Sequence, residues 1–89
     1  MELQRNTHHV YWLMYHFVWI PKYRHKVFVE PYREAMKAII RKIGDDYDFD
    51  IQELEIPENH IHMVVKGEPK VAPSHVMQVI KSISAREFF

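Results

Sequence analysis

The feature that most constrains the fold is a change in hydrophobic periodicity along the chain. The first segment, residues 8–20, is dense in Val, Tyr, Trp and Phe, which favour strands, and Pro21 ends it. Residues 31–43 then carry one apolar stripe at helical spacing. Pro31 suits the first position of that helix, and Gly44 suits a left-handed stop after its last turn. The chain is therefore predicted to begin with a strand followed by a helix.

A two-residue alternation returns after this helix and predicts a pair of strands. Residues 47–56 alternate apolar and polar side chains, but the phase slips at Glu53, which predicts a β-bulge. Residues 57–59 have the composition of a turn, and residues 60–66 alternate again. One face of this second strand carries Ile61, Met63 and Val65, and the opposite face carries His60, His62 and Val64.

The last segment predicts a second helix that runs to the end of the chain. A loop over residues 67–73 precedes it, and Ser74 has the side chain of an N-cap. Its apolar stripe consists of Val76, Val79, Ile80 and Ile83. The order strand, helix, strand, strand, helix predicts an α+β fold, a ferredoxin-like plait without its final strand, with an antiparallel sheet and both helices on one face. We expect a single domain over residues 1–89 that is incomplete at its C-terminus.

The first strand is expected at an edge of this sheet, although its sequence is apolar on both faces. In the complete plait a fourth strand would flank it on its free side. An exposed apolar edge pairs readily with another chain. We therefore expect either self-association, with a homodimer as its simplest form, or a chain that ends before its fold is complete.

Composition excludes several classes of protein. The chain has no cysteine, which excludes disulfide scaffolds and thiolate metal sites and fits a reducing compartment, so we expect a cytoplasmic protein. No apolar run is long enough to span a bilayer, and no secretory signal is expected. The net charge is zero, but residues 1–43 carry eight Lys and Arg against three Asp and Glu, and residues 44–69 carry one against eight. A basic surface can therefore exist within a neutral chain, although solvated faces of alternating sign give the same pattern.

Two of the seven histidines are spaced to share a metal ion. His60 and His62 leave the same face of a strand with their backbones about 6.6 Å apart, so both imidazoles can reach one divalent cation. Such an ion could bind a phosphate oxygen and stabilise the charge that develops during attack on it. Histidines are frequent in this chain, so strand histidines that bind nothing are the alternative. His16 could approach the same ion if the first and third strands pair, and a hydrogen-bonded core histidine is the alternative there.

Three motifs resemble those of a known family. The run H-F-V-W-x-P-K-Y-R, from His16 to Arg24, is similar to the opening of the small single-tyrosine transposases of the HUH endonuclease superfamily, of the IS-two-hundred-like insertion-sequence type. Residues 59–65, N-H-I-H-M-V-V, contain the His-hydrophobic-His core for which the superfamily is named. Residues 81–89, K-S-I-S-A-R-E-F-F, resemble the second helix of the family. The motifs occur in the order and spacing of the family, whose fold is the same plait.

The resemblance implies DNA transposition by a metal-dependent single-stranded DNA endonuclease and strand transferase that acts on hairpin ends. A tyrosine attacks the scissile phosphodiester, becomes linked to the 5′ phosphate and leaves a free 3′ hydroxyl, so no nucleotide cofactor is required. Mg²⁺ or Mn²⁺ is held by His60 and His62 together with one further polar residue. In the family the tyrosine and that residue lie on a helix after the fourth strand, so we expect both beyond residue 89. None of the five tyrosines of this chain carries over as the nucleophile, and we expect the 89-residue chain to be inactive alone.

The resemblance also implies which residues contact DNA. Lys22 and Arg24 in a basic loop, and Lys81 and Arg86 in the last helix, are expected to contact phosphates. Tyr23 lies between the first two and is expected to stack on a base. From the residues alone, a solvated basic loop is the alternative.

Other functions stay open at this point. One is a catalytically inactive remnant, or a domesticated module, that binds structured single-stranded DNA. Another is an RNA-recognition-like plait, which also binds bases on an open sheet, but the third strand carries His60 and His62 where that class has aromatic residues. A purely structural dimerisation domain is the last alternative.

Overall fold

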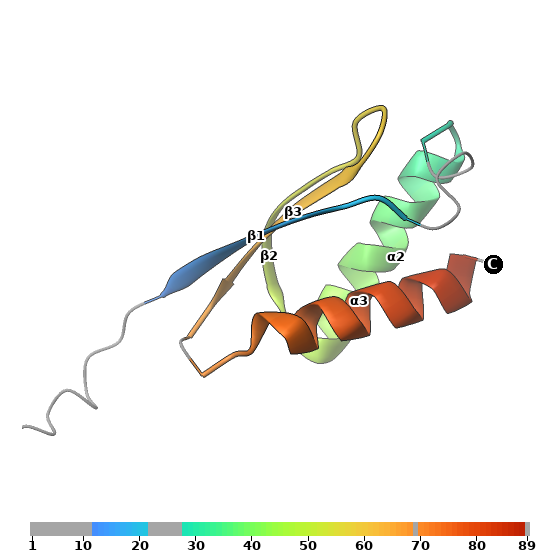
Figure 1. Cartoon of the computed structure of the whole chain (residues 1–89). Coiled ribbons are helices and arrows are strands. Elements are labelled where there is room, and N and C mark those ends of the chain that lie inside the picture. The colour runs from blue at the N-terminus through green and yellow to red at the C-terminus, as the bar shows by residue number, and fades with distance from the viewer. Residues whose placement is uncertain (1–11, 22–27, 69, 89) are drawn as a thin grey trace, which may run out of the picture.

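A three-stranded antiparallel sheet carries both helices on one of its faces (Figure 1). The computed structural model describes residues 12–21, 28–68 and 70–88. The elements in chain order are β1 (Leu13–Trp19), α2 (Tyr32–Tyr47), β2 (Asp50–Glu55), β3 (Ile61–Gly67) and α3 (Pro73–Phe88). The strand order across the sheet is β1-β3-β2, and both pairings are antiparallel. The predicted α+β plait is therefore confirmed, with three strands among the described residues.

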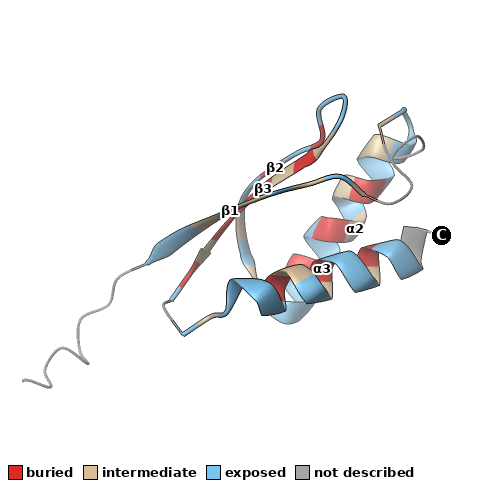
Figure 2. Cartoon of the chain, viewed as in Figure 1, coloured by how far each residue is buried: buried red, intermediate tan, exposed pale blue. Residues whose placement is uncertain are grey.

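The central strand β3 sorts its side chains to the two faces of the sheet. Ile61, Met63 and Val65 are 1%, 0% and 1% exposed and belong to the core cluster, and Figure 2 colours the buried positions along the chain red. His62 and Lys66 lie on the other face, where both are only half-buried. We call this second face, which neither helix covers, the open face. The alternation predicted for residues 60–66 is confirmed over residues 61–66, whereas His60 lies before β3; His62 is left half-buried on the open face.

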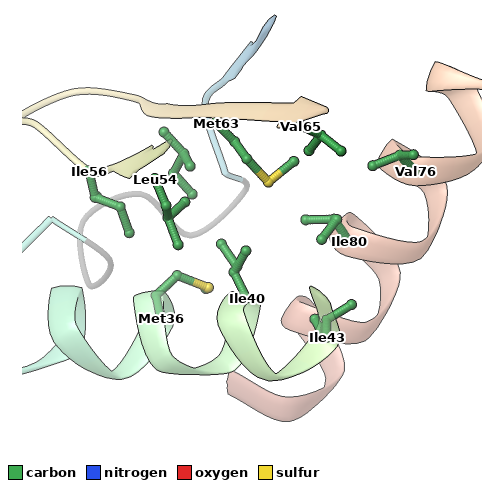
Figure 3. Close-up of a cluster of buried hydrophobic side chains, with 10 residues drawn as sticks. Met36, Ile40, Ile43, Leu54, Ile56, Met63, Val65, Val76 and Ile80 are labelled. Carbon is green, nitrogen blue, oxygen red and sulfur yellow. The ribbon is translucent and has the colours of Figure 1, made fainter. Parts of the chain in front are cut away.

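The core lies between the sheet and the inner faces of α2 and α3 (Figure 3). Ile40 of α2 and Ile80 of α3 are both fully buried, and they meet the side chain of Met63 from β3. Burying an aliphatic side chain of this size stabilises a fold by about 1.5–3 kcal/mol. The other members of the core are Met36, Ile43, Leu54, Ile56, Ile61, Val65 and Val76. The helices are thereby fixed to one face of the sheet. No helix in the described part of the chain is long and apolar enough to cross a membrane.

Edge strand β1 is apolar on both faces, as expected. Its Phe17 and Trp19 are half-buried against the core on the helix side. On the open face its Met14 and Val18 are 51% and 65% exposed. Within the described residues nothing pairs with the free edge of β1, so self-association through it stays a prediction.

The predicted β-bulge is present. The pairing of β2 with β3 shifts by one residue between Ile51, which faces Val65, and Glu53, which faces Val64. Because side chains alternate along a strand, the extra residue Gln52 turns Glu53 and the residues after it onto the opposite phase. Glu55 consequently stands on the open face beside His62.

The expected end of the first helix at Gly44 is wrong. Helix α2 continues to Tyr47, and Asp48 supplies the left-handed residue, with φ 61° and ψ 39°. The amides of Asp48 and Phe49 both donate to the Gly44 carbonyl oxygen. Gly44 instead leaves room for Ile51, because a Cβ there would lie 2.7 Å from Cδ1 of Ile51 and that side chain would have to shift.

The expected N-cap at Ser74 is also wrong. Helix α3 begins at Pro73, and the amides of His75 and Val76 donate to the carbonyl oxygen of Ala72. Proline fits the first helical position because an amide at that position has no carbonyl partner within the helix, so its absence costs no hydrogen bond.

Replacing Asp48 by Gly tests this assignment of the helix end. Glycine adopts positive φ without the steric cost that a Cβ imposes, so Asp48→Gly should raise the free energy of unfolding in urea by about 0.5–1 kcal/mol. Asp45→Gly is the matched control, because that exposed residue has helical backbone angles and should gain nothing. A loss of stability in Asp48→Gly as large as in the control contradicts the assignment.

Candidate metal centre

The open face is built from three rows of side chains that cross β1, β3 and β2. The rows are Val18–His62–Glu55, His16–Val64–Glu53 and Met14–Lys66–Asp50. Residues directly opposite one another in an antiparallel sheet share a face and have their Cβ atoms about 4.5–5.5 Å apart. The open face is therefore apolar and imidazole-bearing along β1 and acidic along β2, with His62 between them.

His62 is the imidazole that the fold positions most firmly. It projects from the central strand, is half-buried, and has Val18 on one side and Glu55 on the other. The centre of its ring lies 6.2 Å from that of His16, with the two planes at 40°. His62 can therefore bind an ion in company with a second imidazole.

His60 lies immediately before β3 and is held by its neighbour. Its Nδ1 is 2.7 Å from the Oδ1 of Asn59, and the side-chain amide oxygen can only accept a hydrogen. In the neutral imidazole the proton then sits on Nδ1, which leaves the lone pair on Nε2. An outer oxygen that holds one ring nitrogen in this way is typical of metal-binding histidines.

His60 and His62 have the right side-chain chemistry to bind a divalent cation, but they do not form a complete ligand set. Imidazole nitrogens bind many divalent transition metals, and an ion also takes oxygen ligands from water or phosphate. Among the described residues no group of three His, Asp or Glu side chains converges closely enough to hold an ion. His60 and His62 thus supply part of a site.

His16 is not a core histidine. It is exposed on the open face and pairs with Val64 across the strands. The alternative of a buried, hydrogen-bonded histidine at this position is therefore wrong.

The acidic edge formed by β2 was not anticipated from the sequence. Asp50, Glu53 and Glu55 are all exposed, and all three stand on the open face. The phase slip at the bulge was the signal that could have revealed it, because without the slip Glu53 and Glu55 would face the helices. Carboxylates beside His62 attract a cation and repel an uncompensated polyanion.

The predicted DNA contacts are not brought together with the histidines. Lys22, Tyr23 and Arg24 lie outside the described residues. Lys81 and Arg86 are exposed on α3, which packs on the face of the sheet opposite to His62. A strand of DNA that touched both sets of residues would have to pass around the edge of the domain.

None of the described tyrosines lies among the open-face rows. Tyr15 faces the helix side and donates its hydroxyl to the carbonyl oxygen of Val71, at 3.0 Å. Tyr47, at the end of α2, stacks on Phe49 with ring centres 5.9 Å apart. Tyr32 is exposed at the first turn of α2. Tyr15 is therefore a packing residue, whereas Tyr32 and Tyr47 are each 47% exposed. Tyr47 lies in α2 and not in the strand expected over residues 47–56.

A groove of about 790 Å³ lies at the other end of β3, away from His62. Aromatic rings form part of its wall: the ring centres of Phe49 and His75 are 6.2 Å apart with their planes at 83°, and Nζ of Lys66 lies 5.0 Å from the centre of the Trp12 ring. None of the residues predicted to bind metal or DNA lines this groove. The histidine site is therefore separate from this groove.

Comparison with known proteins relates the whole of this arrangement to transposases. The chain is 30% identical over 89 residues to the ISDra2 transposase TnpA of Deinococcus radiodurans, covering all of this chain and 64% of that protein. It is 34% identical over 83 residues to the transposase of insertion sequence element IS200 from Salmonella typhimurium, covering 92% of this chain and 55% of that protein. The chain thus spans less than two thirds of the length of these curated relatives.

The fold is shared as well as the sequence. A crystal structure assigned to a transposase from Deinococcus radiodurans R1 matches with a TM-score of 0.82 and 30% identity, over 92% of this chain and 63% of that one. The model of the family described as "Transposase IS200 like" matches residues 9–89. The match includes the histidine strand, both helices and the basic loop, so the chain belongs to the IS200-like transposase family.

Proposed function

We propose that this chain is the metal-binding and DNA-binding core of a transposase that nicks and rejoins single-stranded DNA. In the proposed reaction a tyrosine phenolate attacks the scissile phosphorus, and the bond from phosphorus to the 3′ oxygen breaks. The leaving oxygen takes a proton and becomes a free 3′ hydroxyl, while the 5′ phosphate stays on the tyrosine. Attack by a 3′ hydroxyl on this phosphotyrosine restores a phosphodiester, so no external energy source is consumed.

The observation that carries the proposal is the placement of His62 on the open face of a chain of this family, with His60 two residues before it in the sequence. These two residues would hold Mg²⁺ or Mn²⁺. The chemistry that such an ion supplies when bound is Lewis-acid polarisation of a phosphodiester oxygen. The part of the chain described here holds His62 on the rigid central strand, and Asn59 orients His60. The tyrosine is proposed to come from outside these 89 residues.

The acidic edge supports a cation-dependent mode of DNA binding. Glu53 and Glu55 repel phosphates that approach β2, whereas β1 presents apolar side chains and His16. A bound divalent cation offsets the negative charge next to His62. We therefore propose that a single strand of DNA crosses β1 on the open face and contacts the cation at β3.

Binding of a single-stranded hairpin should accordingly depend on Mn²⁺. Fluorescence anisotropy with a labelled hairpin oligonucleotide should show tighter binding with Mn²⁺ than with EDTA, because the ion bridges protein and phosphate. His62→Ala should abolish this difference, and His75→Ala, on α3, should keep it. Equal affinity in Mn²⁺ and EDTA, with a binding curve for both, would contradict the proposed site.

The 89-residue chain should bind without forming a covalent adduct. Tyr15, Tyr32 and Tyr47 lie away from the open-face rows, so no described phenol is placed to attack a phosphate held at His62. Incubation of a labelled hairpin with the chain and Mn²⁺, followed by denaturing electrophoresis, should show only free DNA. A labelled band at the mass of a protein–DNA adduct would place a nucleophile within this chain.

The basic loop should contribute phosphate contacts. Replacing Lys22 and Arg24 by Gln removes two cations, and each phosphate contact to a single strand contributes roughly 0.7 to the slope of log K against log salt. The double variant should therefore flatten that slope by about 1.4. Lys37→Gln together with Arg41→Gln, on α2, is the matched control for net charge. An unchanged slope in the loop variant removes Lys22 and Arg24 from the interface.

Asn59 should act as a positioning residue for His60. Loss of an outer-shell partner of a histidine ligand typically weakens metal affinity by about 10–100-fold. Asn59→Ala should raise the Kd for Mn²⁺ by roughly tenfold, and Asn59→Asp should restore it, because a carboxylate oxygen also accepts the Nδ1 hydrogen. If Asn59→Ala binds Mn²⁺ as the wild type does, the hydrogen bond has no role in the site.

A further inference from the structure

We infer that His16 is a further ligand of the cation site, so that its imidazoles come from two adjacent strands. This inference rests on the proposed function of His60 and His62, and it concerns a residue of β1 that lies 46 positions away from His62 in the sequence. It makes the pairing of β1 with β3 a requirement for the site, because neither strand alone holds all three rings.

The register of the sheet places His16 next to His62. His16 is directly opposite Val64, and His62 is directly opposite Val18, so the two histidines form a diagonal pair on the open face. Diagonal neighbours in antiparallel sheets lie within reach of long and ring-bearing side chains. The centres of the two rings are 6.2 Å apart.

This separation suits two imidazoles that share one ion. For zinc the metal–nitrogen bond to histidine is about 2.0–2.1 Å long, which puts such an ion roughly 3.2 Å from the centre of the ring. Two such rings on one ion can therefore have centres up to about 6.4 Å apart, and closer when the angle at the metal is less than straight. The observed 6.2 Å lies just below that limit, so the two rings as they stand would be nearly opposite one another on the ion.

The side chain of His16 is exposed, so it can change its rotamer to reach an ion. Three imidazole or carboxylate groups do not already converge among the described residues, so at least one side chain must change its rotamer when an ion binds. His16 is exposed and His60 half-buried, and exposed side chains change rotamer on the picosecond to nanosecond timescale. The backbone of the two paired strands need not move.

Glu55 is the competing candidate for this position. It is directly opposite His62 on β2, and a carboxylate binds divalent cations through oxygen. The ring of His16, however, already lies beside that of His62. Separate substitution of His16 and Glu55 therefore distinguishes the two candidates.

The experiment is a Mn²⁺ titration of the 89-residue chain, with free Mn²⁺ followed by its electron paramagnetic resonance signal. Chain labelled with ¹⁵N-histidine is then used to detect couplings between bound Mn²⁺ and imidazole nitrogens. The variants are His16→Ala, His16→Gln, His60→Ala, His62→Ala and Glu55→Gln, with His75→Ala as the control on α3. Far-ultraviolet circular dichroism confirms that each variant is folded.

The inference predicts couplings from three imidazoles in the wild type, a result that needs no variant. It also predicts that both His16 variants raise the Kd for Mn²⁺ by at least about tenfold and lose one coupling, while His75→Ala changes neither. Couplings from two imidazoles, or an unchanged Kd in the His16 variants, overturn the inference and leave the proposed site intact if His60→Ala and His62→Ala still weaken binding. A loss in Glu55→Gln with none in His16→Ala also overturns it. Unchanged binding in His60→Ala and His62→Ala, or no binding by the wild type, overturns the proposed site together with the inference.

Discussion

Packing of both helices against one face of β3 determines which side chains of the sheet remain accessible. Met63, Ile40 and Ile80 are fully buried and hold α2 and α3 to the same side of the central strand. Because strand side chains alternate, whatever lies between the core residues of β3 must point away from the helices. His62 is therefore kept on the open face by the central strand of the sheet, which is paired on both sides.

The same alternation gives the open face its electrostatic character. The bulge at Gln52 turns Glu53 and Glu55 onto this face, beside the row that contains His62. Histidines next to carboxylates favour a cation over a bare phosphate, and the cation in turn can recruit a polyanion. The basic residues of α3 lie on the other side of the sheet, so in the proposed function their DNA contacts are separate from the contact that the cation makes on the open face.

Much of this arrangement could be predicted from the sequence, because it follows from local periodicity. The order of elements, the sorting of residues 61–65 and the slip at Glu53 are confirmed by the structure. The helix end could not be predicted from composition. Gly44 looked like a left-handed stop, but its role is to let Ile51 approach the helix, a contact between residues of different elements.

Part of the candidate site could likewise be predicted from the sequence, and part of it depends on contacts between strands. The pair His60 and His62 is visible in the sequence because both ligands come from one segment with a fixed repeat. The position of His16 depends on the register between β1 and β3, which alternation alone does not specify. The contribution of β2 depends on both bulge and register: the phase slip in the sequence signals the bulge, but only the register places Glu55 opposite His62.

The central claim is that a divalent cation binds on the open face, and methyl NMR with Mn²⁺ tests it most directly. Paramagnetic broadening falls steeply with distance, so the signals report which side of the sheet the ion occupies. Our account predicts that substoichiometric Mn²⁺ broadens the methyl signals of Val18 and Val64, on the open face, before those of Val76 and Ile80 on α3. Broadening that begins at Val76 and Ile80, or that affects both sets equally, would contradict it.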